Sequence, residues 1–218
     1  MQGMKPHTPH HAIVELRQYT LHPGRREDLI ALFDREFVET QEAVGITVLG
    51  QFRDLDDPDR FVWLRAFASM PARARALAAF YDGPGWRAHR DAANATMLDS
   101  DNVLLLRPAT GTAMPIDGWQ RAHGAARDGA VLAIVGAPGR GFAPVIAGAG
   151  GEIVARYETE PSANNFPRLP VREGEPVAVS LARFFDVAAC TKLADALAST
   201  PVAPMQLLRL APTANSRF

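Results

Sequence analysis

Hydrophobic and polar residues alternate along several short segments of the chain. In residues 13–21 the odd and even positions form two faces of different character, as in a β-strand. Residues 25–44 instead repeat apolar side chains at three- and four-residue steps, which predicts a helix with one apolar face. The two patterns then predict strands at 46–53, 61–68 and 102–107 and helices at 72–81 and 86–97.

This order, β-α-β-β-α-β, is that of a ferredoxin-like unit. A degraded copy follows, with a long proline-rich hairpin at 160–176 and a shortened first helix. Its predicted strands are 130–135, 152–159, 177–185 and 205–210, and its predicted helices are 142–149 and 187–199. The similar closing strands, VLLLRPA and QLLRLAP, indicate an internal duplication.

The predicted fold class is therefore α+β, with two ferredoxin-like halves packed sheet to sheet. An open sheet covered by helices on one face needs a second cover on the other, and a second sheet provides it. We expect a disordered tail at 1–11, a first domain at 12–109, a linker at 110–129 and a diverged second domain at 130–213.

Composition restricts the function. The chain is 47% hydrophobic and 22% charged with a net charge of -1, which is typical of a globular protein and argues against a nucleic-acid partner. The single cysteine, Cys190, excludes an internal disulfide and is expected to be a small buried residue. No signal peptide or membrane span is apparent, so we expect a cytoplasmic protein.

Four segments of the first half resemble the NIPSNAP family: Glu15–Tyr19 leading into Pro23-Gly24, Arg60–Arg65, Phe80–Trp86 and Asn102–Pro108. In the second half, Asn164–Arg172 is similar to a segment of bacterial members with two repeats. The resemblance implies the dimeric α/β barrel superfamily, whose members include cofactor-free monooxygenases and haem-degrading enzymes. It implies no settled activity, because the NIPSNAP family has none.

A first candidate site combines polar and aromatic residues of two strands. Glu15, Arg17 and Tyr19 share one face of the first strand, and Trp63 and Arg65 share a face of the third. If these faces meet between the two sheets, they line a cavity suited to a small anionic or aromatic ligand. The alternative is a buried Arg–Glu ion pair with a purely structural role.

A second group follows the third strand. Tyr81, Trp86 and Asn94 are expected to contribute to ligand binding, and His89 is the best candidate for a general acid or base, because its ordinary pKa lies near neutrality. No carboxylate partner for His89 is evident from spacing, so an exposed histidine is the alternative. In an enzyme, His89 or Arg65 would handle charge while Trp63, Tyr19 and Asn94 frame the substrate.

Two further motifs are better explained as loops. The segment GAPGRG at 136–141 has the wrong spacing for a dinucleotide site, and the aspartates of 54–59 lack the glycine and distal glutamate of a calcium loop. We therefore expect neither a cofactor nor a metal. The long loop around Asn164–Arg172 is expected to cover the cavity or to reach a neighbouring subunit.

These observations favour a protein that binds a small hydrophobic or aromatic molecule between its sheets. The enzyme alternative is a cofactor-independent monooxygenase-like activity on an aromatic substrate. The third hypothesis is an interaction module in which the Asn164–Arg172 loop mediates self-association. A homo-oligomer is expected in any of these cases.

Overall fold

The computed structural model describes residues 11–109, 129–201 and 203–218. The first half contains β1 (Ile13–Leu21), α1 (Arg26–Leu32), a π-helical segment (Phe33–Phe37), α2 (Val38–Glu42), β2 (Thr47–Asp54), β3 (Arg60–Phe67), α3 (Met70–Tyr81), α4 (Pro84–Asn94) and β4 (Met97–Pro108). The second half contains β5 (Ala130–Gly136), α5 (Ala143–Gly148), β6 (Glu152–Thr159), β7 (Ala178–Phe184), α6 (Val187–Ala198) and β8 (Gln206–Pro212).

The eight strands form one closed antiparallel barrel in the order β1-β3-β2-β8-β5-β7-β6-β4. Within each half the order is that of a ferredoxin-like sheet, β4-β1-β3-β2 and β8-β5-β7-β6. Short seams of three residue pairs each, between β2 and β8 and between β4 and β6, join the two sheets edge to edge. The predicted fold class is confirmed.

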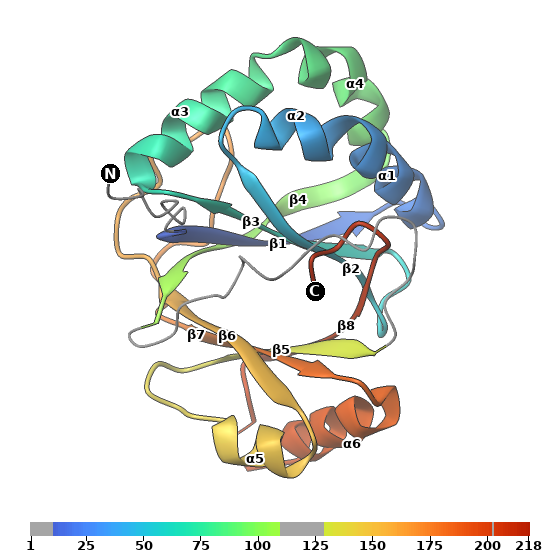
Figure 1. Ribbon diagram of the computed structural model, residues 1–218, viewed down its shortest axis with the longest axis vertical. Coiled ribbons are helices and arrows are strands. Elements are labelled where there is room, and N and C mark those ends of the chain that lie inside the picture. The colour runs from blue at the N-terminus through green and yellow to red at the C-terminus, as the bar shows by residue number, and fades with distance from the viewer. Residues whose placement is uncertain (1–10, 110–128, 202) are drawn as a thin grey trace, which may run out of the picture.

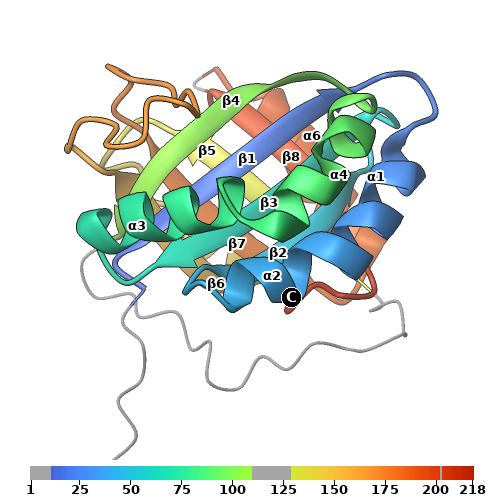
Figure 2. The same ribbon diagram turned by 90° about the horizontal axis from the view of Figure 1, so that it is seen from above.

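The helices lie outside the barrel, in two layers of unequal size. Helices α1 to α4 cover the first sheet, whereas α5 and α6 cover the second from the opposite side (Figure 1). Seen from above, the helices of the first half lie across β1, β2 and β3 (Figure 2). Each sheet therefore has one face toward the barrel interior and one toward its own helices.

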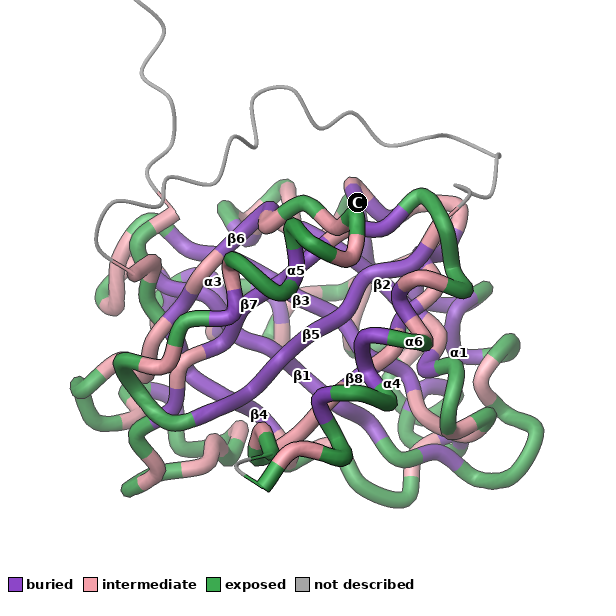
Figure 3. Tube along the Cα trace, turned by 90° about the horizontal axis from the view of Figure 1, so that it is seen from below, coloured by how far each residue is buried: buried purple, intermediate pink, exposed green. Residues whose placement is uncertain are grey.

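Most of the barrel interior is occupied by apolar side chains. One cluster of buried side chains from both sheets occupies it, including Leu16, Phe52 and Leu64 from the first half and Val131 and Leu181 from the second. The central strands are buried along most of their length (Figure 3). Two separate clusters fill the spaces between each sheet and its helices.

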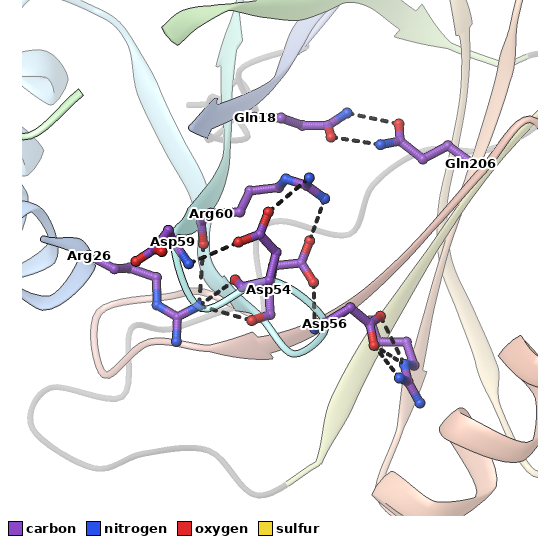
Figure 4. A network of polar contacts seen from close by, with 9 residues as sticks. Gln18, Arg26, Asp54, Asp56, Asp59, Arg60 and Gln206 are labelled. Carbon is purple, nitrogen blue, oxygen red and sulfur yellow. Dashed lines mark hydrogen bonds and ion pairs between the residues drawn. The ribbon is translucent and has the colours of Figure 1, made fainter. Parts of the chain in front are cut away.

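Polar contacts also connect the two halves. The amides of Gln18 on β1 and Gln206 on β8 donate to each other across the barrel at 3.0 and 2.9 Å (Figure 4). Arg209 of β8 forms an ion pair with Asp56 in the loop between β2 and β3. That loop is a hairpin turn held by its own aspartates, and no group of three or more potential metal ligands occurs among the described residues.

The main differences from the sequence prediction lie in the first half. The helix expected at 86–97 ends at Asn94, and β4 begins at Met97 rather than at Asn102, because the first part of β4 pairs with the end of β1. The helix expected at 25–44 is interrupted by the π-helical segment. The predicted linker and tail fall almost entirely outside the described residues, so the domain division stays a prediction.

No helix in the described parts of the chain has the length and hydrophobicity needed to cross a membrane.

Candidate functional site between the first sheet and its helices

The predicted site residues of β1 and β3 lie on the helix-facing side of the first sheet. Tyr19 and Trp63 belong to the cluster between this sheet and α1 to α4, and in the β1–β3 ladder Glu15 pairs with Arg65 and Arg17 with Trp63. The prediction that they line a cavity between the two sheets is therefore wrong. The even positions, Val14 and Leu16, face the barrel instead and help to fill it.

Glu15 is the centre of a buried charge cluster. Its carboxylate lies 2.6 Å from Arg17 Nη1, 2.7 Å from Arg65 Nη2 and 2.6 Å from Arg73 Nε. The side chains of all four residues are at most 1% exposed. Three guanidinium groups therefore surround one carboxylate, and this cluster, here called the Glu15 cluster, carries an excess of positive charge in a region without water contact.

The surroundings set the pKa values in this cluster. Burial alone would raise the pKa of Glu15, but the charges of Arg65, Arg17 and Arg73 outweigh it and hold the pKa well below the usual 4.5. Burial lowers the pKa of Arg73, and the neighbouring guanidinium groups add to this effect against the attraction of Glu15. Burial also raises the pKa of Tyr19, so its hydroxyl keeps its proton.

A small aromatic pocket adjoins the cluster. Its volume is about 30 Å³, room for a water molecule rather than for a ring. It is lined by Tyr19, Leu29, Phe33, Phe37, Gln41, Trp63, Phe80, Tyr81, Trp86, Ala93 and Met97. Phe33 and Phe37 come from the two ends of the π-helical segment, a geometry that occurs frequently at functional sites.

The pocket wall next to the Glu15 cluster carries hydrogen-bond donors. The guanidinium groups of Arg17 and Arg65 lie 5.6 and 5.2 Å from the Trp63 ring. Tyr19 Oη accepts a hydrogen bond of 3.0 Å from Arg17 Nε, so its own proton remains available to another acceptor. The wall is therefore electropositive, which suits a ligand with an electron-rich oxygen.

His89, Tyr81 and Trp86 lie on the helix side of the pocket. Tyr81 and Trp86 line it, with ring centroids 4.9 Å apart. His89 does not line it, but its ring lies 6.5 Å from that of Phe37, and its Nε2 is 3.2 Å from Glu36 Oε2. The carboxylate partner that spacing did not reveal is thus Glu36.

Asn94, by contrast, is exposed at the last residue of α4 and is not among the pocket-lining residues. The structure therefore does not bring this predicted residue into the site.

The long loop of the second half reaches the first half of the same chain. Arg73 Nη1 donates to Asn164 Oδ1 at 3.0 Å and to Asn165 Oδ1 at 2.8 Å. The ring of Phe166 stacks on Tyr81 at 6.1 Å and is buried in the cluster beneath the helices. The loop therefore closes one side of the site, and its apolar anchor, Phe166, packs within the chain.

The second half provides an internal comparison. At the positions that match the Glu15–Arg65 and Arg17–Trp63 pairs, the β5–β7 ladder has Leu132 opposite Ala182 and Ile134 opposite Ser180. Among the described residues of the second half, no charged side chain is buried. The fold can thus be built with an uncharged, apolar layer between the sheet and its helices, so the architecture does not require the buried charges of the first half.

Several site residues were not among those predicted from the sequence. Arg73 carried a readable signal, because it shares the apolar stripe of α3 with Leu77 and Phe80 at i+4 and i+7, where an arginine is unexpected unless paired. Gln41, whose Oε1 accepts a hydrogen bond of 3.4 Å from Arg65, had no comparable signal.

The fold and the charged, aromatic layer define an α/β barrel protein made of two ferredoxin-like halves, and among the described residues the buried charges all lie in the first half. Residues 14–113 match the NIPSNAP family model. The first half of the chain is therefore a NIPSNAP domain, as its motifs predicted.

Solved structures are similar to one half or to the whole chain. An uncharacterized NIPSNAP-like domain protein from Burkholderia xenovorans is 26% identical, with 48% of this chain and 90% of that chain covered and a TM-score of 0.44. A NIPSNAP family protein of unknown function from Agrobacterium tumefaciens is 23% identical, with coverages of 49% and 96% and a TM-score of 0.43.

A putative monooxygenase from Lactobacillus acidophilus is similar over nearly the whole length. It is 12% identical, with coverages of 92% and 93% and a TM-score of 0.51. This likeness shows that the two-half barrel is shared. No curated protein matches the chain.

Proposed function

We propose that the NIPSNAP domain of this protein binds a small aromatic molecule in the pocket between its sheet and its helices. The observation that carries the proposal is an aromatic pocket placed against a buried charge cluster, which has no counterpart among the described residues of the second half. An aromatic ring would pack on Phe37, Trp63 and Trp86.

The pocket is nearly closed in its present form, so binding needs side chains to move. Phe33 and Phe37 are the best candidates, because the π-helical segment that carries them lacks the regular hydrogen bonding of the helices on either side. Ligand binding would then widen the pocket by displacing these two rings.

Substitution of a small pocket residue tests this proposal. Ala93 of α4 is buried and lines the pocket, so Ala93→Leu would fill it. Ala194 of α6 is buried in the corresponding layer of the second half, which makes Ala194→Leu a matched control for overpacking. Both variants and the wild type would be titrated with phenol, 1-naphthol and benzoate by calorimetry and by thermal shift.

We expect at least one compound to bind the wild type and the Ala194→Leu variant and to lose its binding in the Ala93→Leu variant. A ligand present at 100 times its Kd stabilises the folded state by about 2.7 kcal/mol, which corresponds to about 5–10 °C in Tm for a chain of this size. Equal binding by Ala93→Leu, or no binding of the panel to the wild type, contradicts the proposal.

A second candidate function is a cofactor-independent, monooxygenase-like reaction on an aromatic substrate. The observation that favours it is the His89–Glu36 pair beside Phe37, in which the carboxylate would orient the imidazole. His89 does not line the pocket, so it would reach a bound phenol as a base only after Phe37 is displaced. Oxygen consumption with a ligand that binds, and its loss in His89→Gln with binding retained, would support the reaction. Binding without oxygen consumption would leave a binding protein.

A further inference from the structure

A row of buried polar side chains crosses the first sheet beneath the helices. Trp63 on β3 lies directly opposite Gln51 on β2 in the antiparallel ladder. On the other side of Gln51, its backbone oxygen accepts a hydrogen bond of 2.9 Å from the backbone nitrogen of Thr213, just after β8. Trp63, Gln51 and Thr213 are 2%, 0% and 1% exposed.

The polar atoms of this row lack partners. Trp63 Nε1, both amide atoms of Gln51 and Thr213 Oγ1 are buried and make no hydrogen bond. Among the neutral side chains in the described ranges, these three residues alone have buried polar atoms in that condition. Native proteins satisfy nearly all such atoms with protein groups, water or a ligand, so their concentration in one row indicates a place that is built to be occupied.

The row continues from the aromatic pocket. Trp63 lines that pocket, and Gln51 is its neighbour on the far side from Arg17. Directly opposed residues of an antiparallel pair have Cβ atoms about 4.5–5.5 Å apart on the same face. One small chemical group can therefore contact both side chains.

The donors and acceptors specify that group. The indole nitrogen of Trp63 only donates, whereas the amide of Gln51 both donates and accepts. A carbonyl or carboxylate would leave Gln51 Oε1 without a partner, and an ammonium group would leave the Trp63 N–H without one. Of these groups, only a hydroxyl can both accept from Trp63 Nε1–H and donate to Gln51 Oε1, which leaves Gln51 Nε2–H to a second acceptor.

We propose that Trp63 and Gln51 form a hydroxyl-binding subsite of the aromatic pocket, so that the ligand is a hydroxyaromatic compound. This inference rests on the proposed function. The ring would occupy the pocket and the hydroxyl would reach past Trp63 to Gln51. A water molecule offers the same hydroxyl chemistry, so the experiment must distinguish a bound phenol from bound water.

The test compares three probes that share one ring. Phenol carries the hydroxyl, anisole keeps only the acceptor, and toluene has neither. Affinities would be measured for the wild type, Gln51→Leu and Trp63→Phe. Gln18→Leu is the matched control, because Gln18 is also a buried glutamine of the first sheet but pairs with Gln206 across the barrel.

We expect the wild type and Gln18→Leu to bind phenol at least tenfold more tightly than anisole or toluene. Gln51→Leu should reduce that preference about tenfold with its toluene affinity unchanged, and Trp63→Phe should also reduce it. If Gln51→Leu does not fold, Gln51→Met gives the same comparison with an unbranched side chain.

Three results would overturn the subsite. Equal affinities of the wild type for the three probes would show that the hydroxyl is not recognised, while the proposed aromatic pocket would stand. An unchanged preference for phenol in the Gln51 variant would also show that Gln51 does not bind the hydroxyl, while the proposed aromatic pocket would stand. A crystal structure with phenol present but with water still bound between Trp63 and Gln51 would show a water site only. Failure of all three probes to bind would instead contradict the proposed function itself.

Discussion

Replacing Glu15 with glutamine removes the carboxylate from a cluster of three arginines. The ion pairs are 2.6–2.7 Å long, and all four side chains are at most 1% exposed. Glutamine keeps the size and one oxygen acceptor, so the substitution tests charge rather than packing. Breaking a buried ion pair by removing one partner costs about 3–5 kcal/mol, because the remaining charge is left without compensation in a low dielectric.

For a chain of this size, that loss lowers Tm by about 6–20 °C. The free energy of unfolding would be measured by urea titration followed by circular dichroism, with Tm from calorimetry. Glu27→Gln is the control, because Glu27 also pairs with an arginine, Arg53, at 2.6 Å but is 60% exposed. It should cost less than about 1 kcal/mol. A loss below 1 kcal/mol in Glu15→Gln, with the fold intact, would refute the reasoning that the buried carboxylate is needed to balance the guanidinium groups.

Three further predictions concern pH, the long loop and the cysteine. The folded pKa of Glu15 lies below its ordinary value of 4.5, so its contribution to stability is complete above pH 4.5 and is lost as the pH falls toward the folded value. The free energy of unfolding from urea titrations between about pH 5 and pH 3 should therefore fall more steeply for the wild type than for Glu15→Gln. Phe166→Ala should lower the free energy of unfolding by about 3–5 kcal/mol, because Phe166 is buried against Tyr81. The control Phe185→Ala, at a residue that is 75% exposed, should lower it little. Similar small losses for both variants would contradict the anchoring role of the loop. Burial raises the pKa of Cys190 to about 11, so a thiol reagent at pH 8 should label it only after unfolding, and rapid labelling of the folded protein would contradict its burial.

Sequence patterns predicted the elements and the repeated ferredoxin-like order well, because alternation and helical periodicity are local properties. They could not assign the faces of β1. Its residues are buried on both faces, so alternation separates Glu15 and Arg17 from Val14 and Leu16 without stating which set faces the barrel. We expected the polar set between the sheets, but apolar side chains from both halves occupy most of that space.

The residues that pair with the polar side chains of β1 come from distant parts of the chain. Arg73 lies 58 positions after Glu15, and Asn164 lies 91 positions after Arg73. Such contacts depend on how the helices and the loop pack, which no local pattern describes. The same holds for the Trp63–Gln51 pair, because its importance follows from strand register and from the absence of hydrogen-bond partners.

Because both halves belong to one chain, they can differ in sequence and in role, and this affects the number of ligand molecules bound per barrel. A barrel of two identical subunits carries every substitution twice and offers two equivalent sites, whereas here Leu132 and Ala182 can replace Glu15 and Arg65 in one half alone. The apolar layer between the sheet and the helices of the second half avoids the desolvation cost of buried charges. Its stability can therefore offset the lower stability of the polar layer in the first half. A ligand that saturates the protein should accordingly bind once per barrel, and dilution cannot separate the two halves.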